Sequence, residues 1–380
     1  MKYLELINLF RDYFDSQGVE ELEPCGLISP AFPNTFNPSA AHDIVREVVN
    51  TQHVIQLVKR QWVIEKCIRQ VDIPRLGDGT HLCLFEMIAS VIQSPAHSVP
   101  REEVIHQCLQ LISNCLQLPK DRLVITCFGG ANISGMTFEP DSATPNIWRK
   151  FGIKTILFVP GRNNFIYLES EGEAAGPRCE IYYQLERPVG ITRYVEIGSV
   201  IFETHRFHRG RLVETTNVAS GFAFGLERLL MVIDGCYSIY DCDVLKPLVQ
   251  LVINSLTDKK YADVFNDRIL VATDVLKALH FVLVEILAKR PVSLSNQQKD
   301  LLLRLLRVAK EACTALQLSF DTILQPFADM LARIYAHRYP EIEANFPTIS
   351  KILHSLLTSP NRKSLESVLV SCSRNGVGIG

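Results

Sequence analysis

Several features that would assign this chain to a membrane or to a secreted class are missing from its 380 residues. No apolar run reaches the roughly 20 residues that a membrane-spanning helix needs. The opening stretch, MKYLELINLFRDYF, sets charged residues inside an apolar pattern, which predicts an amphipathic helix rather than a secretory signal. We therefore expect a cytoplasmic protein without a membrane partner.

Metal-ligand spacing is also missing. The eleven cysteines include no C-x-x-C pair, and most of them lie inside apolar runs, as Cys108, Cys115 and Cys127 do. An odd number of scattered thiols is typical of a reducing, intracellular compartment. His205 and His208 could be proposed as ligands, but a solvent-facing or core role is more common for such a pair. We expect no zinc and no other metal site.

What is present is the composition of a globular chain, with 47% hydrophobic and 21% charged residues. This length allows one large domain or two domains. The formal charge is −7 over residues 1–245 and +5 over residues 246–380. The C-terminal part is therefore the better candidate for binding a polyanion.

The apolar periodicity changes along the chain. It predicts helices at 2–18, 101–117 and 224–234, a loop at 24–43, and short β-rich runs joined by turns from residue 121 onward. Strands joined by turns favour an antiparallel sheet. After Tyr240 the pattern predicts only helices, at 244–256, 263–289, 297–317, 320–337 and 346–358. We expect an α+β domain at 1–245, a helical domain at 246–370 and a loose tail at 371–380.

Three short stretches could carry chemistry. SGFAFGLERLLM is a glycine-rich turn that leads into a helix carrying Arg228, AAGPRCEIYYQ is a turn that leads into a strand at Glu180, and residues 65–87 contain EKCIRQVDIPRLG and THLCLFEM. A guanidinium suits a phosphate because its planar fork makes two charged hydrogen bonds. Each stretch also has an ordinary explanation: a surface arginine, a solvated carboxylate, and a basic loop between buried strands.

Taken together and in this order, the stretches resemble alanyl-tRNA synthetase, a class II aminoacyl-tRNA synthetase. NVASGFAFGLERL parallels N-V-D-T-G-M-G-L-E-R, GPRCEIYY parallels G-P-C-S-E-I-x-Y, EKCIR parallels Q-K-C-I-R, and LFEM ends the second class motif. LSNQQKDLLLRLLR is similar to the start of the family's helical tRNA-recognition domain. The resemblance implies a class II antiparallel sheet flanked by helices, followed by an all-α domain. The family's editing domain and C-terminal domain have no counterpart in it.

The family uses ATP with Mg²⁺ to form an aminoacyl-adenylate and then transfers the acyl group to tRNA. The resemblance places Arg228 at the γ-phosphate and assigns Glu86, His81 and Glu180 to the ATP site. The second-motif arginine is replaced by Thr80. An arginine that stabilises phosphate charge can contribute about 10³ or more in rate, so this loss is serious. Arg69 or Arg75 could supply a substitute cation.

The amino-acid pocket differs from the family pattern as well. Ile166 replaces a tryptophan, and Gly198-Ser199 replaces W-N. The aspartate that would bind the substrate ammonium is Ala219, or Gly221 if the local gap is placed differently. A buried ammonium without a carboxylate partner loses several kcal/mol of hydration. We therefore do not expect alanine to bind in the family manner.

On the tRNA side, Asn296 matches an asparagine that helps to read a G·U pair in the acceptor stem, and Lys299 matches a nearby arginine. Arg304 and Arg307 share one helical face, which suits phosphate contacts. A solvated basic face explains these two residues equally well.

Two functions follow. The first is a paralogue of the synthetase core that does not make alanyl-tRNA and acts by binding tRNA, a nucleotide or a protein partner. The second is an active ATP-dependent ligase that adenylates a different acid and passes it to tRNA or to a carrier. A purely structural subunit would fit the apolar helices but would explain the retained motifs poorly.

Overall fold

The computed structural model describes residues 1–189, 192–257, 266–288 and 293–374. The chain divides into two compact units that are both discontinuous in sequence. The first unit holds residues 1–25, 39–65 and 86–237, and the second holds 26–38, 66–85 and the chain from 238 onward. This division differs from the single cut near residue 245 that the sequence suggested, because two early segments group with the C-terminal helices. The functions expected for the two domains stay predictions.

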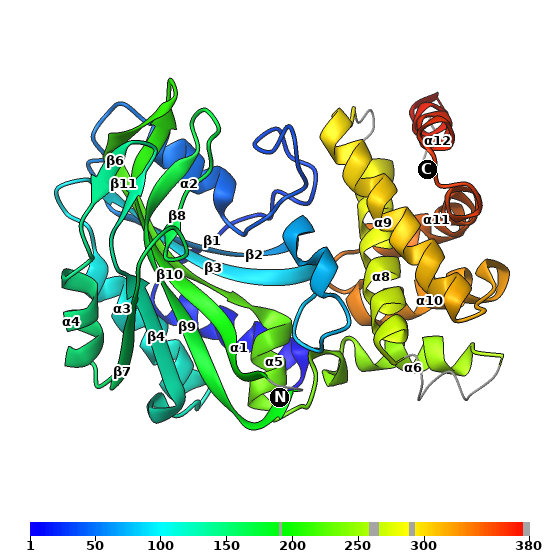
Figure 1. The fold of residues 1–380 in the computed structure, drawn as a ribbon, viewed down its shortest axis with the longest axis horizontal. Helices are drawn as coiled ribbons and strands as arrows, with labels where there is room; N and C mark the ends of the chain where they lie inside the picture. The colour runs from blue at the N-terminus through cyan, green and yellow to red at the C-terminus, as the bar shows by residue number, and fades with distance from the viewer. Residues whose placement is uncertain (190–191, 258–265, 289–292, 375–380) are drawn as a thin grey trace. The chain divides into compact units, whose positions relative to one another are not determined.

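The first unit is built on one nine-stranded sheet, whose long central strands run side by side in Figure 1. The strand order is β1, β2, β3, β11, β10, β9, β4, β7, and β8 pairs with β9. β3, β11, β10, β9 and β4 are antiparallel neighbours, whereas β1–β2 and β4–β7 are parallel pairs. The predicted antiparallel core is therefore confirmed. The bounds are β1 Glu20–Glu21, β2 Lys59–Ile68, β3 Leu84–Pro95, β4 Leu123–Phe128, β7 Thr155–Val159, β8 Phe165–Ile166, β9 Ala174–Val189, β10 Thr192–His208 and β11 Arg211–Gly225.

Aromatic packing attaches α1 (Tyr3–Ser16) to one face of this sheet. The ring of Phe14 stacks on Trp62 of β2 at 4.9 Å and on Phe222 of β11 at 6.4 Å between centroids. α2 (His42–Asn50) packs against β9, β10 and β11. The remaining elements of this unit are α3 Arg101–Gln110, η2 Leu111–Cys115, η3 Lys120–Arg122, the hairpin β5 Ala131–Ile133 with β6 Met136–Phe138, α4 Ala143–Lys150 and α5 Leu226–Ile233.

The second unit is helical around α8 (Asn266–Ala288), which packs against α6 (Lys246–Asn254), α9 (Asn296–Ala315) and α11 (Glu341–Thr358). α10 (Phe320–Tyr335) packs on α11 and α6, and the short helices η1 (Gln70–Arg75) and η4 (Ile239–Asp241) complete the unit. The predicted helices are present, and residues 263–265 and 289 of the one expected at 263–289 lie outside the described residues. In the described part of the chain, none is long and apolar enough to span a membrane.

One further helix, α12 (Arg362–Arg374), was not predicted. The side chain of Asn361 begins it by accepting a hydrogen bond from the backbone N–H of Ser364 at 2.9 Å, and Leu365 is fully buried. The helix continues to Arg374, which is four residues into the segment expected to be loose. Residues 375–380 of that expectation lie outside the described residues.

Candidate functional site

On the sheet face that points away from α1, a row of directly opposed residues crosses four neighbouring strands. Glu180 of β9 lies opposite Ser199 of β10, Ser199 lies opposite Ala223 of β11, and Ala223 lies opposite Ala89 of β3. Directly opposed residues put their side chains on the same face. Phe222 directly precedes Ala223 in β11, so its side chain points to the opposite face, where it stacks on α1. The row therefore forms a floor of small uncharged side chains with one carboxylate on its flank.

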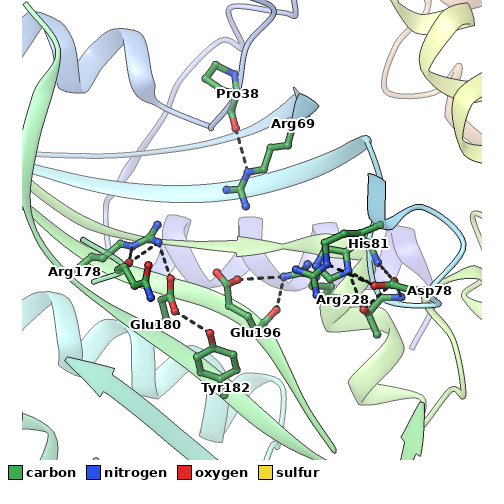
Figure 2. A network of polar contacts seen from close by, with 12 residues as sticks. Pro38, Arg69, Asp78, His81, Arg178, Glu180, Tyr182, Glu196 and Arg228 are labelled. Atoms are coloured by element: carbon green, nitrogen blue, oxygen red, sulfur yellow. Dashed lines mark hydrogen bonds and ion pairs between the residues drawn. The ribbon is translucent and has the colours of Figure 1, made fainter. Parts of the chain in front are cut away.

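Glu180 belongs to a cluster of polar side chains on β9. Arg178 donates through Nη2 to Glu180 Oε1 at 2.6 Å, and the hydroxyl of Tyr182 donates to Glu180 Oε2 at 2.8 Å (Figure 2). Burial, together with the negative charge of Glu180, raises the pKa of Tyr182, so the phenol keeps its proton and continues to donate. The carboxylate predicted from GPRCEI is thus paired rather than simply solvated.

Arg228 lies in the first turn of α5 and points to β10. Its Nη1 donates to the backbone oxygen of Glu196 at 2.9 Å and lies 3.5 Å from Glu196 Oε2 (Figure 2). The side chain of Arg228 is only 18% exposed. The register sets Glu196 opposite Tyr182. Arg228 is therefore not an ordinary surface charge. It binds Glu196, whose partner across the strands, Tyr182, belongs to the Glu180 cluster. Glu196 and Tyr182 were not predicted as site residues, although Tyr182 belongs to the quoted stretch AAGPRCEIYYQ.

Glu86 is enclosed in the first unit. It is 2% exposed, and its carboxylate accepts a hydrogen bond from the hydroxyl of Tyr3. Its backbone N–H donates to the carboxylate of Glu227 at 3.1 Å. These bonds connect β3 to α1 and α5, so Glu86 has a structural role here.

In the second unit, Thr80 and His81 surround a carboxylate. Asp78 Oδ1 accepts the backbone N–H groups of Thr80 and His81 at 2.8 and 3.0 Å, and Asp78 Oδ2 lies 2.7 Å from His81 Nδ1. Burial alone would raise the pKa of Asp78, but the hydrogen bonds from His81 and Thr80 outweigh it and lower this pKa to about 2. Thr80, which stands where the family has an arginine, is therefore bonded to a negatively charged carboxylate in the same turn.

The two arginines proposed as substitutes differ in their surroundings. Arg75 is 61% exposed and lies 3.9 Å from Asp78. Arg69 donates through Nε to the backbone oxygen of Pro38 at 3.4 Å, and its guanidinium lies 5.1 Å from the ring centroid of Phe85. Arg69 is thus the more ordered of the two cations.

Neither of the two positions that could correspond to the family's ammonium-binding aspartate has room for a larger side chain. Ala219 is 0% exposed and lies opposite Glu203 of β10 and Gln93 of β3. At the other candidate position, Gly221, an added Cβ would lie 1.9 Å from the backbone oxygen of Ser90. Neither position can therefore hold a carboxylate side chain unless its neighbours move.

The carboxyl group opposite Ala219 does not replace the missing charge. Burial raises the pKa of Glu203 to about 8, so this group is mostly protonated at neutral pH. A neutral carboxylic acid gives a substrate ammonium no counter-ion. Glu203 was not predicted, although an acidic residue inside the apolar run VIFETH was a signal for it.

The other altered positions do not all line the same face. Gly198 lies opposite Phe224, and an added Cβ there would lie 2.4 Å from Phe224 Cδ1. Phe224 packs beside Phe222 on the α1 side of the sheet, with 5.4 Å between ring centroids. Only Ser199 of the Gly198-Ser199 pair faces the row of Glu180. Ile166 is half-buried in β8, opposite Gly176.

A cavity of about 420 Å³ lies beside Glu180, over β4, β7 and β9. Its walls are mostly apolar, and this volume is in the range of small-molecule sites. Its apolar residues are Val124, Leu157, Val159, Tyr182 and Tyr194.

Among the described residues, the ligand atoms of Cys25, Asp43 and Glu65 lie within 4.8 Å of one another. The carboxylate of Glu65 already accepts the backbone N–H groups of Cys25 at 2.6 Å and Ala41 at 3.0 Å. These bonds explain the buried Glu65 without an ion. His205 and His208 point to other partners, Thr204 at 2.9 Å and Glu171 at 2.5 Å.

The residues predicted to bind tRNA all lie on α9, but they fall into two groups. Asn296 accepts a hydrogen bond from Arg362 of α12, and Lys299 lies 4.0 Å from Glu366 of the same helix. Arg304 and Arg307 are exposed and make no ion pair within the described ranges. The second pair therefore forms an open basic patch.

Comparison with known proteins gives a consistent result. A family model described as tRNA synthetases class II (A) matches residues 5–357. The alanine–tRNA ligase of Borrelia hermsii is 26% identical over 368 residues, which cover 90% of this chain and 58% of that protein. The mitochondrial alanine–tRNA ligase of Mus musculus is 28% identical over 335 residues, which cover 85% of this chain and 32% of that protein. The chain thus spans 58% and 32% of the length of these two relatives.

Proposed function

Because this chain belongs to the family of class II tRNA synthetases (A), we propose that it is an alanyl-tRNA-synthetase-like core that does not make alanyl-tRNA and acts by binding. The observation that carries this proposal is the closed ammonium position. Ala219 is fully buried, and Gly221 has no room for a side chain. An alanine ammonium would lose its hydration there without gaining a counter-ion, which costs several kcal/mol.

A second change, in the other unit, supports the same proposal. Class II chemistry depends on positive charge around the phosphates of ATP. Thr80 stands where the family has an arginine, and its backbone and hydroxyl both bind the carboxylate of Asp78. Two independent changes, one for each substrate, thus act against alanyl-adenylate formation.

The partner that the charges favour is RNA. Arg304 and Arg307 are one turn apart on α9 and exposed, so both guanidinium groups can reach neighbouring phosphates. A tRNA acceptor stem is the RNA that the family relationship suggests. A protein partner is a further option for the helical unit. The cytoplasm is the compartment that we propose.

We further propose that ATP binds weakly at Arg228. Its guanidinium is oriented by Glu196 and could exchange this contact for a phosphate oxygen. The accompanying Mg²⁺ prefers carboxylate oxygens, which Glu180 and Glu196 could offer on this face.

The alternative is an active ligase for a different acid. The cavity of about 420 Å³ beside Glu180 favours it, since its apolar walls could hold an acyl chain larger than that of alanine. The retained EKCIR stretch gives it little support, because two of its residues have structural roles. Glu65 binds backbone N–H groups, and Lys66 lies 3.3 Å from both Glu285 and Glu341 in the second unit.

Acid-dependent exchange of pyrophosphate into ATP distinguishes the two functions. The full chain would be screened against the standard amino acids and a set of apolar carboxylic acids, with an alanine–tRNA ligase as positive control. We expect no exchange with any of them. Exchange with an apolar acid that Arg228→Ala abolishes would establish the alternative, and exchange with alanine would overturn both.

A further inference from the structure

Charged and polar side chains form hydrogen bonds and ion pairs between α9 and α12. Arg362 of α12 donates through Nη1 to Asp300 at 2.7 Å and through Nε to Glu366 at 3.0 Å. The same guanidinium donates through Nη2 to the amide oxygen of Asn296. Lys299 Nζ lies 4.0 Å from Glu366. We call this set of five residues the α9–α12 contact.

The contact covers one half of the predicted RNA surface and leaves the other half open. Asn296 is the first residue of α9, held there by Ser295 and Gln298, which bond to each other's backbone at 3.0 and 3.2 Å. Its amide oxygen is used by Arg362. Arg304 and Arg307, two and three turns further along, have no such cover from the described part of α12. The family model ends at residue 357, so α12 lies outside the matched segment.

We infer that α12 competes with RNA for the N-terminal turn of α9 and so holds this chain in a state of reduced RNA affinity. This inference rests on the RNA binding proposed above. A base amino group that donates to the amide oxygen of Asn296 competes with Arg362 for that oxygen. Glu366 of α12 also lies 4.0 Å from Lys299 and takes up part of the positive charge that a phosphate would need. Arg304 and Arg307 can make the first contact while α12 is still bound.

The contact is weak enough to be displaced. Arg362 is 36% exposed, and its two carboxylate partners are 70% and 49% exposed. Ion pairs at such exposures are screened by water and salt and contribute little. Opening also withdraws the buried Leu365, three residues after Arg362, and this favours the closed state. Exchange between a closed and an open α12 is therefore expected without unfolding of the unit.

Arg362→Ala in the full chain tests this inference, and Lys363→Ala is the matched control. Lys363 is exposed on the same helix, so both variants remove one positive charge. The first readout, without RNA, is hydrogen exchange of the backbone of α12. We expect faster exchange in Arg362→Ala than in Lys363→Ala. Equal exchange in the two variants would overturn the inference.

The second readout is binding of a tRNA acceptor-stem hairpin. We expect Arg362→Ala to bind roughly two- to fivefold more tightly than Lys363→Ala, which corresponds to the loss of a weak ion pair. The gain should disappear when Asn296→Ala is added. Weaker binding by Arg362→Ala than by the control would mean that Arg362 itself holds RNA, and would overturn the inference. If neither the wild type nor any variant binds RNA while α12 exchange still increases, the proposed RNA function fails, and the competition fails with it.

Discussion

Arg228 of α5 donates to the backbone oxygen of Glu196 in β10 at 2.9 Å, and the carboxylate of Glu196 lies 3.5 Å from the same nitrogen. The arginine leaves the first turn of a helix and is fixed on a strand that is distant in sequence. This contact orients the guanidinium along the face that carries Glu180. It also neutralises part of the charge that a phosphate would need, so we expect nucleotide binding to be weak.

Arg228→Ala should lower the affinity for ATP by about 10- to 100-fold. Charged hydrogen bonds to a phosphate contribute about 1.5–3 kcal/mol, and about 1.4 kcal/mol corresponds to a factor of ten. Titration calorimetry of the full chain with Mg·ATP measures the change. Arg149→Ala is the control, since Arg149 is an exposed residue of α4. Equal ATP affinity in the two variants would remove Arg228 from the proposed site.

Arg304→Ala and Arg307→Ala should each weaken binding of an acceptor-stem RNA irrespective of its sequence. Each should also reduce the slope of log affinity against log salt by about 1, because one counter-ion fewer is released. Filter binding over a range of salt concentrations measures both effects. Lys351→Ala on α11 is the control, since Lys351 is also exposed. An unchanged salt slope in the arginine variants would argue against an RNA surface on α9.

Glu203→Gln should stabilise the protein, and more so as the pH rises. The unfolded chain releases this proton near pH 4.5, whereas in the folded state the pKa of Glu203 is about 8. Between these values the folded state binds more protons, so the stability of the wild type falls with rising pH at about 1.4 kcal/mol per unit. Between about pH 5.5 and 7.5 the advantage of the variant should grow by about 2–3 kcal/mol.

Urea unfolding at the two pH values measures this difference. Glu47→Gln, at an exposed position of α2, is the control and should show the same stability difference from the wild type at both values. If the advantage of Glu203→Gln does not change with pH, Glu203 is not a buried neutral acid, and the argument about the missing counter-ion loses one of its supports.

Ala219→Asp should destabilise the protein without restoring alanine activation. The new carboxylate would be buried at a position that is 0% exposed, which costs several kcal/mol, about 3 or more. Ala143→Asp, at an exposed position in the first turn of α4, should cost almost nothing. Thermal unfolding and alanine-dependent pyrophosphate exchange are the measurements. A stable Ala219→Asp variant that activates alanine would show that the pocket is open.

Much of the fold was predictable because the local patterns agree with it. The helices after residue 240 have apolar residues at helical spacing, and the strands β9, β10 and β11 are bounded by turn residues. α2 was missed because its sequence, HDIVREVVN, is rich in β-branched residues, which have low helix propensity. It is helical because it packs on β9, β10 and β11, a tertiary effect that no local pattern reports.

The sequence predicted which residues occupy the site positions, but not their contacts or their burial. Arg228 was identified from its motif, but its partner Glu196 lies 32 residues earlier, on a strand that no local pattern pairs with α5. Gly198 and Ser199 point to opposite faces of the sheet because they are consecutive residues of one strand. The burial of Ala219 and the raised pKa of Glu203 depend on how other parts of the chain pack around β10 and β11. Sequence reasoning could show that the aspartate was replaced, but not that the space was closed.

The central claim is that this chain does not make alanyl-tRNA. Its most direct test is the formation of alanyl-tRNA from ATP, labelled alanine and tRNA by the full chain, run beside an alanine–tRNA ligase on the same RNA. We predict no alanyl-tRNA above the level of a reaction without protein, while the ligase charges the RNA fully. Alanyl-tRNA formation that depends on this chain and is lost in Arg228→Ala would contradict the account.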